Sequence, residues 1–363
     1  MLKDPEELSH AWLDLQDRAD CSYFLSWGWI GTWLQQIAVE LNPVVVRVWH
    51  GEQLVGLAVF VPRDIKRRLI FRASALFLNE YPFDHKNMVI EYNGLLVARG
   101  HESGVYTETV RHLIQEYKQH DEFHFGAIAE GAAVDKLTQA AGTWARFQVS
   151  EESTAWQVDL NALEPGIDAF LTTLSKNRRT QLRRSIRLYE EQGPLNLVEA
   201  QDPEQALAFF DGLKILHTAR RQSKGEGGAF ANPLWEQFHR SLIQAHSDAG
   251  EIQLIKVSNP VMTIGYLYNI VWRKQVYVLQ TGFMPAEDKR DLPGYVVHTL
   301  AIVYNRNNGM AVYDLMHGDS LYKRILCNRS QKLIWSVVQR HRLKFSLERL
   351  AVGVVRRCRQ AMN

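Results

Sequence analysis

The sequence has 363 residues but contains little cysteine and no long apolar run. Its three cysteines, Cys21, Cys327 and Cys358, are far apart and match no metal-ligand spacing, so neither a disulfide framework nor a metal site is expected. No run of about 18 uncharged apolar residues occurs, which argues against a transmembrane helix. The segment Met1–Glu7 lacks the basic start and apolar run of a signal peptide. The expected location is therefore the cytoplasm, with the inner face of the membrane as an alternative.

An excess of charge of one sign is also missing, because the formal net charge is only +2. Proteins that bind nucleic acid usually present broad basic surfaces, so DNA is not an expected partner and any anion site must be a local patch. Hydrophobic residues make up 46% and charged residues 23%, which is typical of globular proteins. Because a domain usually has about 100–200 residues, this length predicts two domains.

The first part of the chain predicts a mixture of helices and strands. An aromatic helical stretch at 24–39 brings Trp27, Trp29 and Trp33 together, either in the core or as a sugar-stacking platform. Asn93-Gly94 lies between apolar runs and predicts a hairpin over 88–98, because both residues of such a turn need positive φ. The other expected elements are strands at 44–49, 54–61 and 122–128 and helices at 108–120 and 134–141.

The second part predicts helices that alternate with mostly antiparallel strands. A strand at 155–160 leads into it, and a helix from 167 continues toward the basic segment 175–187. The further expected elements are strands at 195–199, 252–257, 261–272, 275–281 and 312–315 and helices at 203–221, 233–249, 295–305 and from about 320. We predict an α/β (α+β) fold with a mixed, mostly antiparallel sheet flanked by helices.

Polar and titratable residues crowd the segment Val312–Lys323. Its first four residues suit a buried strand end, His317-Gly318 suits a turn, and Asp319 or Ser320 can cap the helix that follows. Corners at which a strand passes into a helix are common places for chemistry in α/β folds. The candidates for catalysis or binding at this corner are Asp314, His317, Asp319, Tyr322 and Lys323.

A second candidate site lies where a helix begins at Pro293-Gly294. A proline and a glycine at a helix entry leave backbone N–H groups open to an anion, which the helix dipole also attracts. Lys289 and Arg290 add positive charge in the preceding loop. The alternative is an ordinary capped helix.

Together, Asp291–Gly294 and Val312–Lys323 resemble segments of the acyl-CoA N-acyltransferase (GNAT) superfamily. The resemblance is closer to its two-lobed branch around the CelD-type cellulose-biosynthesis acetyltransferases, a relative of the FemAB peptidyltransferases. It covers residues 166–326 best and the first lobe only loosely. It implies tandem GNAT-like lobes at 1–154 and 155–340, the first of them degenerate, and a basic amphipathic helix at 341–363.

The resemblance also implies where the donor binds. GNAT enzymes place the coenzyme A pyrophosphate at the start of the helix that begins here at Pro293-Gly294. The implied cofactor-binding residues are Gly294, Lys289, Arg290, Tyr295 and Lys323. This loop has one glycine, which departs from the usual glycine-rich pattern.

The implied chemistry is acyl transfer from a thioester. A tyrosine on the matching helix is the acid in many GNAT enzymes, so Tyr322 is the candidate that protonates the leaving thiolate. The attacking amine must lose a proton, and His317 or Asp314 is the candidate base because both lie in the same corner. No cysteine has a base and an orienting group near it in the sequence, which favours direct attack over a covalent intermediate.

The segment Lys176–Arg187 carries six cations. On a helix, Arg179, Arg183 and Arg187 line one face at a spacing of four and can bind phosphates of the coenzyme, a polyanionic substrate or RNA. The alternative is a solvated face. A further substrate-binding candidate is Glu91, which we expect to orient an amine.

The last stretch, 343–359, predicts an amphipathic helix with Leu343, Leu347, Leu350, Val354 and Cys358 on one side and four arginines around the other. Such a helix packs on its own lobe or contacts an anionic membrane surface or a partner.

The predicted function is an acyl-CoA-dependent N- or O-acyltransferase, most simply an acetyltransferase, that acts on a cell-envelope or polysaccharide-related acceptor. One alternative is FemAB-type aminoacyl transfer from tRNA, which the basic segment favours and the near-neutral charge disfavours. The other is a non-catalytic binding module of a polysaccharide assembly system, which the single-glycine loop favours.

Overall fold

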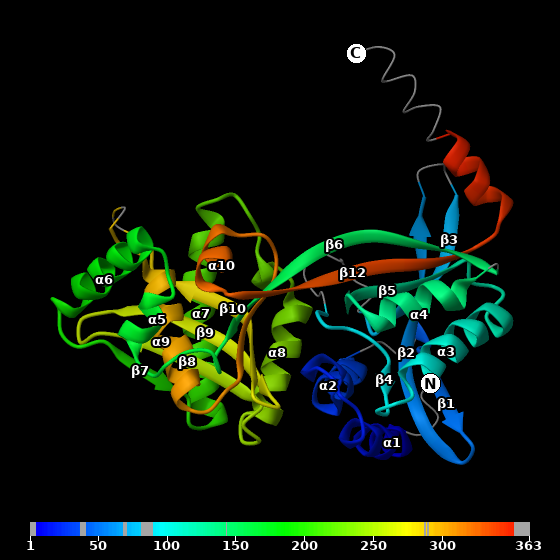
Figure 1. Ribbon diagram of the computed structural model, residues 1–363, viewed down its shortest axis with the longest axis horizontal. Coiled ribbons are helices and arrows are strands. Elements are labelled where there is room, and N and C mark those ends of the chain that lie inside the picture. The colour runs from blue at the N-terminus through cyan, green and yellow to red at the C-terminus, as the bar shows by residue number, and fades with distance from the viewer. Residues whose placement is uncertain are drawn as a thin grey trace, which may run out of the picture. The chain divides into compact units, whose positions relative to one another are not determined.

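The computed structural model describes residues 5–36, 41–67, 71–80, 90–142, 144–286, 288 and 290–351. The chain folds into two compact units, of which one comprises Met1–Glu152 with Leu333–Asn363 and the other Ser153–Lys332 (Figure 1). The chain leaves the first unit within β6 (Ala145–Asp159) and returns to it within β12 (Arg329–Arg340). Residues 333–340, which the sequence-based division assigned to the second lobe, thus pack with the first unit. No helix in the described ranges is long and apolar enough to cross a membrane.

The first unit contains a mixed sheet in the order β1-β2-β3-β5-β12, and among the described residues of these strands only the β3–β5 pair is parallel. Its elements before β6 are α1 (Pro5–Asp17), α2 (Trp27–Gln36), β1 (Val44–His50), β2 (Gln53–Lys66), β3 (Arg72–Leu78), β4 (Leu96–Val97), α3 (Glu102–Glu116), β5 (Glu122–Ala129) and α4 (Ala132–Ala141). Trp29 and Trp33 are buried, which places them in the core rather than on a sugar-stacking surface, and Trp27 is half-buried against Trp12.

The hairpin predicted at Asn93-Gly94 is wrong. Neither residue has positive φ, and the left-handed conformation falls on Tyr92 instead. Asn93 forms a parallel bridge to Ile128, and β4 pairs with β2. The Asn93 side chain is buried and donates to the Leu78 carbonyl at 2.9 Å while accepting from Asn79 at 2.9 Å. A buried amide network thus overrides the local turn preference; Met88 and Val89 lie outside the described residues.

The second unit contains a mixed sheet in the order β7-β8-β9-β10-β11-β6, in which only the β10–β11 pair is parallel. Its elements are α5 (Ile167–Thr172), α6 (Lys176–Glu190), β7 (Asn196–Glu199), α7 (Pro203–Gln222), α8 (Pro233–His246), β8 (Ile252–Ser258), β9 (Thr263–Trp272), β10 (Gln275–Phe283), α9 (Pro293–Asn307), β11 (Val312–His317) and α10 (Leu321–Leu326). The predicted mixed, mostly antiparallel sheet flanked by helices is therefore confirmed.

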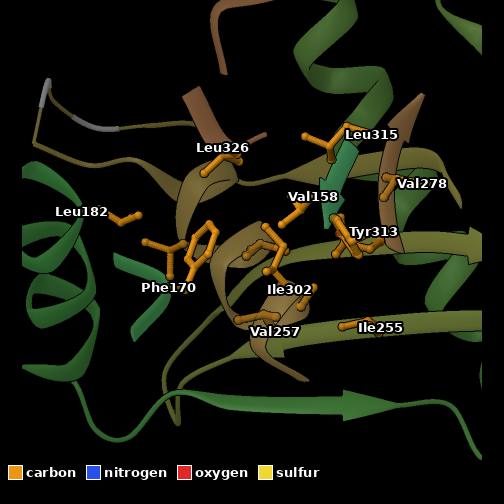
Figure 2. Close-up of a cluster of buried hydrophobic side chains, with 14 of the residues drawn as sticks. Val158, Phe170, Leu182, Ile255, Val257, Val278, Ile302, Tyr313, Leu315 and Leu326 are labelled. Carbon is orange, nitrogen blue, oxygen red and sulfur yellow. The ribbon is translucent and has the colours of Figure 1, made fainter. Parts of the chain in front are cut away.

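Helices cover both faces of this sheet. A methyl group at Gly282 would lie 2.5 Å from the backbone of Leu213 in α7, whereas one at Gly265 would lie 3.2 Å from Val297 in α9. The two glycines are on neighbouring strands but point to opposite faces, since Gly282 pairs with Tyr266. The core beneath α9 gathers side chains from the sheet and from α5, α6 and α10 (Figure 2).

Candidate active site

A cavity of about 480 Å³ lies in the second unit beside the last residues of β10. β10 pairs with β11 only from Gln275–Val312 to Tyr277–Asp314, and a bulge follows between Val278 and Gln280. Beyond that point, in the described part of the chain, β10 keeps β9 as its partner. The two parallel strands separate here, and the cavity wall is built from Arg220 of α7, Phe283 of β10, Gly294, Tyr295 and His298 of α9 and Tyr322 of α10.

The start of α9 forms one end of this cavity. Pro293 occupies the first turn, and Leu292 at the N-cap has no side chain that caps the helix. The first-turn N–H groups, carried by Gly294 and Tyr295, therefore lie at the positive end of a 15-residue helix whose N-cap side chain does not cap it, and the Asp291 carboxylate lines the same end of the cavity. A methyl group at Gly294 would lie 3.1 Å from the Phe283 ring, so glycine keeps this end of the cavity open.

The loop before α9 is held by its own polar contacts. Arg290, predicted to bind the cofactor, donates from Nε to the Asp288 carboxylate at 2.7 Å and is exposed; Lys289 lies outside the described residues. Asp291 is buried and accepts a hydrogen bond from the Tyr189 hydroxyl of α6, while the Leu292 N–H donates to Ser185 Oγ at 3.0 Å. Helix α6 thus holds the loop before α9 through Tyr189 and Ser185.

Two cations that the sequence did not single out lie at or near the cavity: Arg220 lines its wall, whereas Arg178 contacts the lining residue Tyr295 from outside the wall. The Arg178 guanidinium lies 4.8 Å from the centre of the Tyr295 ring, and the Arg220 guanidinium lies 5.9 Å from that of Phe283. Of the predicted α6 arginines, Arg183 pairs with Asp168 at 2.8 Å and does not line the cavity. Arg179 is half-buried and Arg187 is exposed.

Tyr322 and His298 form the other end of the cavity. Their rings stack with centroids 5.5 Å apart and planes 15° apart. Burial raises the pKa of Tyr322 to about 12, against the opposing effect of Arg220, so the phenol keeps its proton at neutral pH.

Burial, helped by Lys323 and Arg220, lowers the pKa of His298 to about 3. The ring is therefore neutral at physiological pH. Nδ1 lies 3.1 Å from the Tyr313 hydroxyl, and Nε2 is buried without a hydrogen-bond partner.

The remaining residues of the predicted corner lie outside the cavity wall. Asp314 is fully buried and accepts from Gln157 Nε2 at 2.8 Å and from the Met316 N–H at 2.6 Å. Lys323 donates to the carbonyls of Met316 at 3.2 Å and His317 at 2.5 Å. These contacts close the turn in which Met316 has φ of +64°. The turn presents Tyr322 to the cavity.

Two other predicted sites have different surroundings. Asp319, a candidate cap, forms an exposed ion pair with Arg324, and Ser320 takes the N-cap position of α10. Glu91 belongs to the first unit, where its side chain is buried.

Part of the sequence matches a known family, and the fold is similar to that of solved structures. Residues 176–324 match the family model described as the acetyltransferase (GNAT) domain. Three solved structures resemble nearly the whole chain at low identity. FemX has a TM-score of 0.55 at 11% identity, with 92% of this chain and 96% of that chain covered. The C-terminal domain of a putative lysylphosphatidylglycerol synthetase from Agrobacterium fabrum has a TM-score of 0.55 at 12% identity, with 97% of each chain covered. L-PGS from Bacillus licheniformis has a TM-score of 0.55 at 10% identity, with 96% of each chain covered.

No curated protein sequence matches this chain. The family match nevertheless shows a GNAT acetyltransferase domain at 176–324, which contains both segments from which the resemblance was inferred. The structural similarities show that the chain shares its fold with FemX and with the lysylphosphatidylglycerol synthetase domains.

Proposed function

We propose that this protein is an acyl-CoA-dependent acyltransferase whose donor and acceptor meet in the cavity of the second unit. The observation that carries the proposal is one cavity with the start of a 15-residue helix at one end and a protonated, buried tyrosine at the other. A donor that contains an acyl thioester and a pyrophosphate needs both features. The helix start offers a site for the negative charge, and the tyrosine offers a proton donor for the leaving sulfur.

The donor is proposed to bind with its pyrophosphate at the first turn of α9, beside Gly294 and Tyr295. Arg220 supplies positive charge over Phe283, and Arg178 does so above Tyr295. The amide groups of the pantetheine arm can pair with backbone groups of β10 beyond the residues that pair with β11. This arrangement directs the thioester toward Tyr322.

In the proposed reaction, an amine or hydroxyl of the acceptor attacks the thioester carbonyl carbon. The new carbon–nitrogen or carbon–oxygen bond forms as the carbon–sulfur bond breaks, and the electron pair leaves on sulfur. Tyr322 donates a hydrogen bond to the sulfur as this charge grows, which matters most in the transition state. His317, rather than Asp314, is the proposed acceptor of the proton from the nucleophile, because the Asp314 carboxylate is fully buried and accepts from Gln157 and the Met316 N–H. The neutral His298 is too weak a base for an ammonium group, because its pKa is only about 3.

The acceptor is proposed to be a cell-envelope or polysaccharide-related molecule in the cytoplasm or at the inner face of the membrane. A second candidate function is aminoacyl transfer from tRNA, favoured by the similarity to FemX and by the arginines of α6. The third, a binding module without catalysis, is favoured by the single glycine, Gly294, in residues 288–294.

Calorimetric titration with acetyl-CoA, CoA and tRNA separates these candidates. Saturable binding of acetyl-CoA and CoA, without binding of tRNA, supports the acyl-CoA enzyme. Binding of tRNA alone overturns it in favour of aminoacyl transfer. If the protein unfolds cooperatively but binds none of acetyl-CoA, CoA and tRNA, the result supports the non-catalytic module.

The α6 arginines provide a prediction that contrasts neighbouring residues. Arg178→Ala removes the cation above Tyr295, and we expect the Kd for CoA to rise about tenfold, the typical cost of one charge-assisted contact. The variant that combines Arg179→Ala, Arg183→Ala and Arg187→Ala should remain folded. It should lose affinity for the donor or the acceptor if these residues hold an anion, and keep it if they do not. Arg111→Ala on α3, which removes another exposed arginine, is the control. Unchanged affinity and salt dependence in the triple variant would make that face of α6 a solvated surface.

A further inference from the structure

The helix at residues 343–351, in the first unit, presents three leucines to solvent. Leu343, Leu347 and Leu350 are 85%, 62% and 67% exposed. Their spacing of four and then three residues places them on one face of the helix. A row of exposed large apolar side chains is costly in water and marks an interaction site.

The opposite face of this helix holds it on the first unit. Phe345 is 1% exposed, and Glu348 accepts from Arg67 at 2.9 Å. Beside them, Lys344 donates to the Asp121 carboxylate at 2.5 Å. These contacts fix the rotation of the helix, so the leucine face points outward because the other face is packed. The helix thus packs on the first unit, but through Phe345 and Glu348 rather than through the three leucines.

The surroundings of the leucine face are positively charged. Arg349 donates to Gln339 and Ser346, which are neutral partners, and Arg342 shares the Asp121 carboxylate with Lys344. The sequence from 341 to 363 has a single acidic residue, Glu348, which is paired with Arg67. Its six cations are Arg342, Lys344, Arg349, Arg356, Arg357 and Arg359, the last three of which lie beyond the described residues.

We propose that this leucine face docks on an anionic lipid surface. The leucines would enter the boundary between headgroups and acyl chains, and the arginines would lie among the phosphates. A second copy of the chain fits this face less well. A symmetric pair would bring the same helix against itself and would place its unneutralised cations near those of its twin.

The test is sedimentation of the full-length protein with vesicles of phosphatidylcholine alone or of phosphatidylcholine with phosphatidylglycerol. We expect binding to the anionic vesicles and at least about tenfold weaker binding to the neutral ones, because cations near the surface each add to the attraction. Raising the salt concentration should weaken the binding. Replacing Leu343, Leu347 and Leu350 by serine should reduce it by a further tenfold or more, since the apolar contribution is lost.

The matched control replaces three exposed apolar residues elsewhere, Leu13, Ile215 and Val261, by serine. It should bind the vesicles like the wild type, and both variants should keep the wild-type melting temperature because no buried side chain changes. Absence of binding to anionic vesicles, or equal loss in both variants, overturns the proposal. So does a dimer in light scattering without lipid that the leucine variant abolishes, since the face would then be an interface between copies. The surface lies outside the unit that holds the cavity, so either outcome leaves the proposed acyl transfer untouched.

Discussion

Replacing Tyr322 by phenylalanine should lower turnover by a factor of about 10²–10⁴, the usual cost of removing one acid or base. The substitution removes only the hydroxyl, and the ring can keep its stacking on His298. Affinity for CoA should hold, because the hydroxyl acts on the sulfur mainly as negative charge develops there. Steady-state kinetics with acetyl-CoA, together with calorimetry for CoA, measures the two effects separately.

The matched control for this variant is Tyr295→Phe, which removes a hydroxyl from the same cavity at the end where the pyrophosphate is proposed to bind. It should change affinity more than turnover. Unaltered turnover in Tyr322→Phe would remove the tyrosine from the mechanism and leave the turn at Met316 with a structural role.

The pH dependence provides an independent check. Because the pKa of Tyr322 is raised to about 12 and that of His298 is lowered to about 3, neither group changes its charge between about pH 5 and 10. A limb of the pH–rate profile in that range must come from another group. If His317 is the base, His317→Ala should shift the acidic limb, whereas a profile that the substitution leaves unchanged excludes it.

The sequence was sufficient to predict the fold class and residues at both ends of the cavity, Gly294 and Tyr295 at one and Tyr322 at the other. The corner at Val312–Lys323 is local in sequence, so a strand, a turn and a helix could be recognised from consecutive residues. The structure places Tyr322 in the cavity wall, whereas Asp314 and Lys323 are engaged with the turn itself. Sequence alone could not make this distinction, because all three residues have titratable side chains in the same short segment.

Residues brought into the cavity by tertiary packing gave little or no signal. Arg220 lies on α7, far along the chain from α9, and only the folded structure brings it to the cavity wall beside Phe283. For the basic helix, the spacing of four identified Arg179, Arg183 and Arg187, but Arg178 is the arginine that lies over Tyr295. A periodic pattern identifies a helix face without showing which neighbour that face meets. The Asn93-Gly94 turn failed for a related reason, since the buried contact with Asn79 is not visible in the local sequence.

Replacing Gly294 by glutamate should weaken CoA binding by about 100-fold or more, equivalent to about 2.7 kcal/mol. The new carboxylate would lie at the N–H groups proposed to hold the pyrophosphate and would compete for them as an anion. Gly294→Ala separates charge from bulk: its methyl group would lie 3.1 Å from the Phe283 ring, which can shift by a few tenths of an ångström, so its loss should stay below about tenfold. Calorimetry with CoA measures both variants, and a thermal melt checks the fold. If both variants lose little CoA affinity, the pyrophosphate binds elsewhere. If both lose much affinity, the added bulk at position 294 weakens binding, rather than the added charge. If the pyrophosphate binds at the start of α9, a large loss of CoA affinity should occur only in the glutamate variant, because only its carboxylate competes with the pyrophosphate for the N–H groups.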